Sequence, residues 1–196
     1  PFDADYADLV QIHQNANRAA ALVRQLLAFS RKQALQPETL QLEDLLEEVV
    51  HLLTRLVGER IVLTLHHDPA LPAIRADRRQ LEQVIVNLVV NARDAMPMGG
   101  EIRIETEALT MPADRVIGRV RLPAGHYATI RVIDKGVGIA PDLLDKIFEP
   151  FFTTKRQGEG TGLGLSTAYG IVKQMGGYIF VDSVEGAGST FSLYFG

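Results

Sequence analysis

The stretch Gly158-Glu159-Gly160-Thr161-Gly162-Leu163-Gly164-Leu165-Ser166 leads directly into an expected helix over 163–175. Such a run can be a linker, but at the start of a helix the free backbone N–H groups and the helix dipole favour phosphate. It is not a Walker A loop, since no Gly-Lys-Ser/Thr follows. It is not a dinucleotide-binding fingerprint either, since no strand precedes it. A glycine-rich lid that closes over phosphates fits the run better.

A second cluster, Asp134-Lys135-Gly136-Val137-Gly138, follows an expected strand over 126–133. An Asp at a strand end is often only a turn residue. In the functional interpretation, a buried carboxylate accepts a hydrogen bond from the exocyclic amine of adenine. It rejects guanine, which presents an acceptor at that position. The flanking glycines would let the backbone approach a flat ring closely.

A third cluster is the amide pair Asn87 and Asn91, four residues apart on an expected helix that starts at Asp77. Residues at this spacing share one helix face. Their amides can make local hydrogen bonds within the protein, or their carbonyl oxygens can bind Mg²⁺, which prefers oxygen donors and keeps waters and substrate phosphates. The spacing alone leaves both interpretations open.

The hydrophobic periodicity of the chain predicts an α/β fold. Apolar residues at three- and four-residue steps predict helices over 42–56, closed by Gly58, and from Asp77 to the residues before Pro97. Strands are expected over 61–66, 101–108, 126–133, 178–183 and 189–195, with a loop or hairpin excursion between the second and third. Because these strands come in antiparallel pairs, we expect a two-layer α/β sandwich with a mixed, mostly antiparallel sheet and helices on one face.

The beginning of the chain has a different character. Its first 36 residues contain no glycine, and apolar residues at helical spacing predict one long amphipathic helix over 8–33, which Pro37 ends. An amphipathic helix of this length needs a packing partner, usually in a bundle. We therefore expect two parts, a helical segment over 1–37 and an α/β domain over 38–196.

Composition excludes several classes of function. The net charge of −4 gives no reason to expect nucleic acid or an anionic membrane as a partner. The chain has no cysteine, which removes disulfides and thiolate metal sites and favours a reducing, cytosolic setting. It also has no apolar run of the roughly 18–20 residues that span a bilayer.

Four segments, considered together and in their order along the chain, bear on the family of the protein; they are 87–92, 134–138, 147–155 and 160–166. They resemble the N, G1, F and G2 boxes of the catalytic and ATP-binding domain of bacterial sensor histidine kinases. That domain belongs to a superfamily that also includes gyrase, the heat-shock chaperones and the MutL repair proteins. The resemblance covers Leu40 to the end and implies the Bergerat ATP-binding fold. The helix over 8–33, in turn, resembles the second helix of the dimerisation and histidine-phosphotransfer region.

The resemblance implies ATP and Mg²⁺ as ligands. Asn91, with Asn87, would hold Mg²⁺. Asp134 would bind the adenine amine, and Thr190 would assist through water. Lys155 is either a phosphate contact or a solvated lid charge. The site residues implied are Asn87, Asn91, Asp94, Ala95, Asp134, Gly136, Gly138, Ile139, Phe151, Phe152, Lys155, Gly160, Thr161, Gly162, Leu163, Gly164, Leu165 and Thr190. Within this set, residues 160–165 would supply amides to the β- and γ-phosphates, and the two phenylalanines would anchor the lid.

Two departures from the wider pattern bear on the reaction. Hydrolysing members of the superfamily carry a glutamate as general base four residues before the metal asparagine, but this chain has Asn87 there, which cannot take a proton. Transfer to an acceptor is therefore favoured over hydrolysis. None of the five histidines matches the family's phosphoacceptor, so we do not expect this chain to phosphorylate itself; they are His13, His51, His66, His67 and His126.

The resemblance also implies partners. These are the dimerisation and phosphoacceptor helix of the same kinase, in a homodimer, and the receiver domain of a response regulator. It further implies a cytoplasmic domain of a membrane-anchored kinase. The alternative is a module that docks to a partner in a nucleotide-dependent way and has no transfer activity. Intact boxes argue against that alternative, but motifs do not measure competence.

Overall fold

The computed structural model describes residues 35–118, 120–155 and 160–196. Its helices are α2 (Leu42–Val57), α3 (Arg78–Asp94), α4 (Gly164–Gln174) and the short 3-10 helix η1 (Pro141–Leu143). Its strands are β1 (Glu38–Leu40), β2 (Ile61–His66), β3 (Ile74–Ala76), β4 (Gly100–Met111), β5 (Arg115–Ile117), β6 (Val120–Leu122), β7 (Gly125–Asp134), β8 (Tyr178–Val184) and β9 (Gly188–Phe195). The long helix expected over 8–33 lies outside the described residues.

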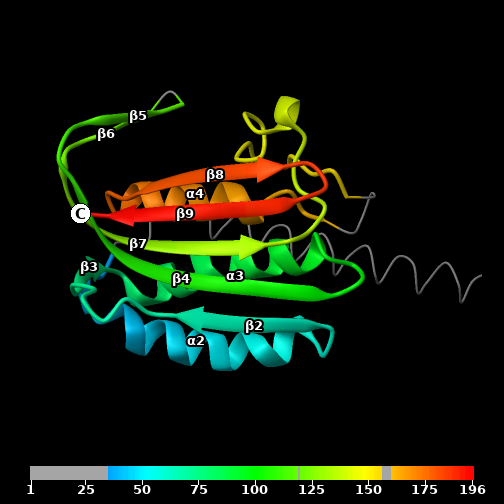
Figure 1. Cartoon of the computed structure of the whole chain (residues 1–196), viewed down its shortest axis with the longest axis horizontal. Coiled ribbons are helices and arrows are strands. Elements are labelled where there is room, and N and C mark those ends of the chain that lie inside the picture. The colour runs from blue at the N-terminus through cyan, green and yellow to red at the C-terminus, as the bar shows by residue number, and fades with distance from the viewer. Residues whose placement is uncertain (1–34, 119, 156–159) are drawn as a thin grey trace, which may run out of the picture.

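Five strands form the main sheet in the order β2-β4-β7-β9-β8, and α3 and α4 lie behind it in Figure 1. All neighbouring pairs are antiparallel except β2 and β4, which run parallel because α3 lies between them in the chain. Two small two-stranded sheets, β1-β3 and β5-β6, complete the fold. This confirms the predicted two-layer α/β sandwich with a mixed, mostly antiparallel sheet.

The core lies between the helices and the sheet. Helix α3 begins where Asp77 accepts a hydrogen bond from the N–H of Gln80 at 3.1 Å, as its N-cap position predicts. Helix α2 ends at Gly58, which has φ 83°. Both helices bury an apolar stripe against inward-facing strand residues, and the side chains that are 0% exposed include Leu45, Leu46, Leu81, Ile85, Leu88, Ile102, Ile104, Ile130 and Leu193. The packing of these apolar stripes against the sheet fixes the position of α3.

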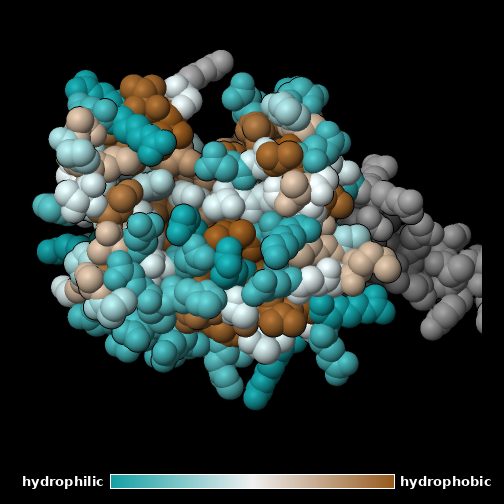
Figure 2. All heavy atoms as spheres, viewed as in Figure 1, coloured by the Kyte–Doolittle hydropathy of each residue, from teal (hydrophilic) through white to brown (hydrophobic). Residues whose placement is uncertain are grey.

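The opposite face of the sheet carries charge. Because side chains alternate across a strand, Arg103 and Glu105 point away from the helices between the inward Ile102 and Ile104. Glu105 bridges two arginines, with Arg103 Nε at 2.9 Å and Arg131 Nη2 at 2.8 Å. Figure 2 shows this face as a mixture of polar and apolar areas. No described helix has the length and apolar character that crossing a membrane requires.

The structure adds elements that the sequence pattern did not predict. The expected excursion between β4 and β7 is the β5-β6 hairpin. The pairing of β1 with β3 was not anticipated, since each strand has three residues and α2 and β2 lie between them in the chain. The strands β4 and β7 are also longer than expected at both ends.

Candidate nucleotide-binding site

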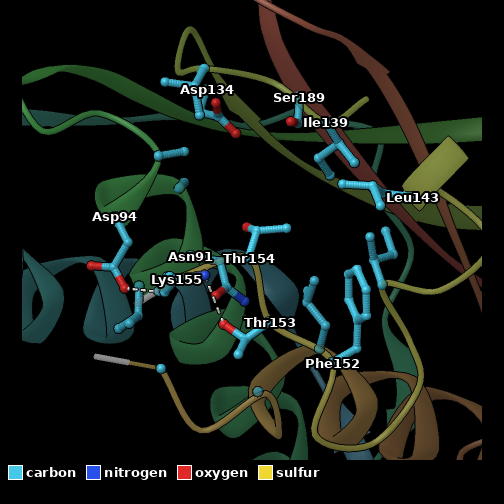
Figure 3. A pocket seen from close by; sticks show the side chains of 18 of the residues that line it. Asn91, Asp94, Asp134, Ile139, Leu143, Phe152, Thr153, Thr154, Lys155 and Ser189 are labelled. Atoms are coloured by element: carbon cyan, nitrogen blue, oxygen red, sulfur yellow. Dashed lines mark hydrogen bonds and ion pairs between the residues drawn. The ribbon is translucent and has the colours of Figure 1, made fainter. Parts of the chain in front are cut away.

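A cavity of about 730 Å³ opens between the C-terminal half of α3, the end of β7, the loop over 135–143 and the segments on either side of residues 156–159. This volume lies in the range of ligand pockets in proteins. In Figure 3, Asp134 and Ser189 lie on one side of the cavity and Asn91, Thr153 and Phe152 on the other. Ile139 and Leu143 lie along an apolar edge. The cavity therefore combines a polar end with an apolar wall that suits a flat ring.

Asp134 is the buried acid of the cavity. It ends β7, is 5% exposed, and accepts a hydrogen bond from the N–H of Gly136 at 2.8 Å. Burial raises the pKa of this carboxyl above its usual value, and hydrogen bonds from the backbone N–H groups of Gly136 and Ser189 offset only part of that rise. A carboxylate has about four lone-pair sites, so acceptor capacity remains for a ligand amine.

The loop after Asp134 is fitted to its surroundings through its two glycines. A Cβ atom on Gly136 would lie 2.6 Å from the carbonyl oxygen of Ala95, which accepts a hydrogen bond from Val137 at 3.0 Å. Gly138 has φ 67°, and a Cβ atom there would lie 2.1 Å from the carbonyl oxygen of Val184. The loop thus lies directly against the end of α3 and against the β8-β9 turn, where no side chain fits.

Asn91 and Asn87 have different surroundings. Among the residues that the structure describes, none hydrogen-bonds the side-chain amide of Asn91, which lines the cavity. Asn87 is already engaged: its Nδ2 donates to the carbonyl oxygen of Gly164 at 3.1 Å, and its Oδ1 accepts from Gln83 at 3.2 Å. The free carbonyl oxygen of Asn91 fits a hard cation such as Mg²⁺. Asn87 holds the start of α4 against α3.

The lid segments before and after residues 156–159 are tied together. The N–H of Phe151 donates to the carbonyl oxygen of Gly162 at 2.9 Å. A Cβ atom on Gly160 would lie 2.8 Å from Oγ1 of Thr153. The N–H of Leu163 contacts Oγ1 of Thr161 at 3.3 Å. Helix α4 begins at Gly164, so its first N–H groups are close to the cavity that Gly164 lines.

An ion pair between Lys155 Nζ and Asp94 Oδ2, 2.5 Å apart, lies at the lid side of the cavity (Figure 3). Asp94 also pairs with Arg93 at 2.7 Å. Burial raises the pKa of Asp94, but the hydrogen bonds and charges of Lys155 and Arg93 outweigh it, so the net shift is downward. Lys155 is therefore positioned at the cavity wall by an acid of α3.

The structure brings most of the predicted site residues together around the cavity, and four of them do not line it. Gly136 donates its N–H to the carboxylate of Asp134, Phe151 is 54% exposed, and Leu163 is buried. Thr190 differs from the expectation most clearly. It pairs with Ile133, so alternation along β9 directs it to the outer face, and Ser189, which pairs with Asp134, faces the cavity instead.

Sequence reasoning missed several lining residues. Those not anticipated are Val90, Ala92, Arg93, Val137, Ala140, Leu143, Ile147, Thr153, Thr154, Glu185, Ser189 and Phe191. Ser189 could have been found from the burial alternation expected for β9, since Phe191, Leu193 and Phe195 form its inward set. None of the four described histidines lines the cavity.

Comparison with known proteins agrees with this geometry. The family described as histidine kinase-, DNA gyrase B-, and HSP90-like ATPase matches residues 76–196. Sensor kinase CckA from Brucella abortus (strain 2308) is 53% identical over 192 residues, which are 98% of this chain and 20% of that protein. The chain thus spans about a fifth of the length of that relative.

Solved structures show the same fold. The nucleotide-free catalytic domain of histidine kinase ThkA is 31% identical, with a TM-score of 0.66 over 82% of this chain and 95% of that domain. ThkA in complex with the response regulator protein TrrA is 25% identical, with a TM-score of 0.72 over 100% of this chain and 52% of that one. The predicted kinase resemblance is confirmed: the chain belongs to the family of histidine kinase-, DNA gyrase B- and HSP90-like ATPases, as a catalytic domain of the histidine-kinase type.

Proposed function

We propose that this domain binds Mg-ATP and transfers its γ-phosphoryl group to a histidine of a dimerisation helix, for relay to an aspartate of a receiver domain. The observation that carries the proposal is the buried Asp134 at one end of the cavity and, at the other, the amide of Asn91, which no described residue hydrogen-bonds. The acid suits the adenine amine, and the amide oxygen suits the cation on the triphosphate. The kinase names of the relatives and the receiver complex of ThkA support the same reaction class.

In this proposal, the residues that line the cavity bind Mg-ATP and position its phosphates. Mg²⁺, when bound, would neutralise phosphate charge, and Asn91 would hold it with Asn87 alongside. Backbone N–H groups over 160–165 would receive the β- and γ-phosphates, and Lys155 would exchange Asp94 for phosphate as the lid closes. Phosphoryl transfer depends mainly on such positioning and charge neutralisation. The nucleophile comes from the histidine of the partner helix, in a homodimer of the full kinase, which we propose to be anchored to the membrane with this domain in the cytoplasm.

Two alternatives give different results. A gyrase-like ATPase needs a general base near the attacking water, and Asn87 cannot accept a proton there. A docking module without transfer activity would bind nucleotide but leave an added phosphoacceptor histidine unmodified. The structure of the cavity suits both the kinase and the docking module, so the experiment must measure binding and transfer separately.

The test begins with calorimetric titration of a non-hydrolysable ATP analogue and Mg²⁺ into the chain and into Asp134→Asn. A GTP analogue tests base selectivity, and Asp142→Asn, an exposed acid of η1, is the matched control. We expect adenine-selective binding that only the Asp134 substitution abolishes. A separate protein that carries the phosphoacceptor helix is then incubated with the chain and labelled ATP. Labelled histidine supports the kinase, binding without label supports the docking module, and steady phosphate release without an acceptor indicates an ATPase.

A further inference from the structure

Three metal-ligating side chains meet away from the nucleotide cavity. Glu43 and Glu47 are four residues apart on α2 and share one face of that helix. His67 follows the last residue of β2, the strand against which α2 lies in Figure 1. One ring nitrogen of His67 and one oxygen of each carboxylate all lie within 4.8 Å of one another. None of the three lines the nucleotide cavity.

A second observation concerns the imidazole of His67 itself. Nε2 of His67 is buried and has no hydrogen-bond partner among the described residues. Its Nδ1 lies 3.2 Å from Oγ1 of Thr106, and neither nearby glutamate forms an ion pair with the ring within the described part of the chain. A buried polar atom without a partner is costly. In the tautomer whose Nδ1–H donates to Thr106, the lone pair is at Nε2, which is the arrangement of a metal-binding imidazole.

We propose that Glu43, Glu47 and His67 form a site for one divalent transition-metal ion of the Zn²⁺ class. One imidazole nitrogen and two carboxylate oxygens are a donor set that Zn²⁺ accepts, at bond lengths of about 2.0–2.2 Å. Three protein ligands leave one position for water, which agrees with the exposure of both glutamates. Mg²⁺ and Ca²⁺ prefer sets made only of oxygen donors, so they are disfavoured.

A bound ion would join α2 to the end of β2 and, through Thr106, to β4. It would also cancel repulsion between two carboxylates on one helix turn. The site is therefore structural, and it does not depend on the proposed phosphoryl transfer. The bound ion would hold in place the end of α2 that follows β1. Metal binding to the folded chain alone raises its melting temperature, because a ligand that binds only the native state stabilises it.

The test is calorimetric titration of ZnCl₂ into the nucleotide-free chain, with the variants Glu43→Gln, Glu47→Gln and His67→Gln. Asp44→Asn removes the same charge from the same turn of α2 and is the matched control. We expect one Zn²⁺ per chain, an affinity at least ten-fold lower in each of the three variants, and none of this loss in the control. Because both glutamates are exposed, their variants test the site without disturbing the core.

Co²⁺ absorption supplies a second readout, since its visible bands report a low-coordinate site with a nitrogen ligand. We expect these bands in the chain and in Asp44→Asn, and their loss in His67→Gln. Absence of Zn²⁺ binding, or binding of equal strength in all four variants, would overturn the proposal. A rise in melting temperature with MgCl₂ equal to that with ZnCl₂ would overturn the assignment to the Zn²⁺ class.

Discussion

The N–H of Phe151 donates to the carbonyl oxygen of Gly162 at 2.9 Å, and both residues have a positive φ, 68° and 65°. Phe151 is the one non-glycine residue with positive φ in the described part of the chain. Such a conformation in a bulky residue costs of the order of 1–3 kcal/mol and persists only where the surroundings enforce it. This hydrogen bond, hereafter the clasp, thus joins the segments before and after residues 156–159 beside the cavity, and it holds Phe151 in a strained backbone conformation.

Gly162→Ala breaks this clasp. The added Cβ would lie 2.3 Å from the carbonyl carbon of Phe151, at a φ that alanine adopts poorly. We expect ATP-analogue affinity to fall by about ten-fold or more, because the added methyl group displaces Phe151 from its contact with Gly162. Gly170→Ala in α4, whose Cβ meets nothing within 4 Å, is the control and should leave affinity unchanged. Equal affinities of the Gly162 variant and the parent chain would show that the clasp does not position the lid.

Asp134→Asn should stabilise the ligand-free domain. The folded-state pKa of Asp134 lies above the unfolded value of 3.8, so its ionised form is disfavoured by folding. The penalty is absent below pH 3.8 and grows as pH rises through the interval up to the raised pKa. Urea unfolding at pH 7 should therefore give a higher free energy of unfolding for the variant, and the difference should shrink towards pH 3.5. A variant less stable at pH 7 would contradict this reasoning.

The sequence could predict those features of the fold and the site that depend on neighbouring residues. The Asp134 motif, the Asp77 cap and the closure of α2 at Gly58 each depend on a few neighbouring residues, so local chemistry predicts them. The contact of Gly136 with Ala95 joins a loop to a helix end about 40 positions earlier, and only the folded chain shows it. The same holds for the β1-β3 pairing.

Lys155→Met should raise the pKa of Asp94. Burial raises that pKa in any case, and the parent chain offsets this with hydrogen bonds and charge from Lys155 and Arg93, so removal of Lys155 leaves burial less opposed. A carbon-detected NMR titration of the Asp94 carboxyl should show a higher midpoint in the variant. The control is Lys146→Met, an exposed lysine on the loop after η1. An unchanged midpoint would mean that the ion pair does not persist in solution.

The same substitution carries a stability signature. A lowered folded-state pKa stabilises the fold above the unfolded value and loses that effect as pH falls through the folded-state pKa. The side chains are 33% and 24% exposed, so the loss at pH 7 should stay below about 1 kcal/mol. Denaturant unfolding should show the parent chain and Lys155→Met converging in acid.

Ser189 and Thr190 offer a matched pair of neighbouring hydroxyls on opposite faces of β9. Ser189 pairs with Asp134 and lines the cavity, whereas Thr190 pairs with Ile133 and faces outward. The Oγ of Ser189 also lies 2.9 Å from Oγ of Ser183, which accepts a hydrogen bond from the N–H of Ile139 on the cavity wall. The hydroxyl of Ser189 is therefore held in place beside the acid that we propose to bind adenine.

We expect Ser189→Ala to weaken binding of an ATP analogue by roughly three- to ten-fold, the range that loss of one hydrogen bond of about 0.5–1.5 kcal/mol produces. Thr190→Val, which removes a hydroxyl one residue away, should bind as the parent chain does. Calorimetric titration of both variants measures the difference directly, and thermal unfolding verifies that each remains folded. The reverse result would be weaker binding in Thr190→Val and unchanged binding in Ser189→Ala. It would favour a role for Thr190 at the adenine, as the sequence resemblance implies, over the role that the β7-β9 register gives to Ser189.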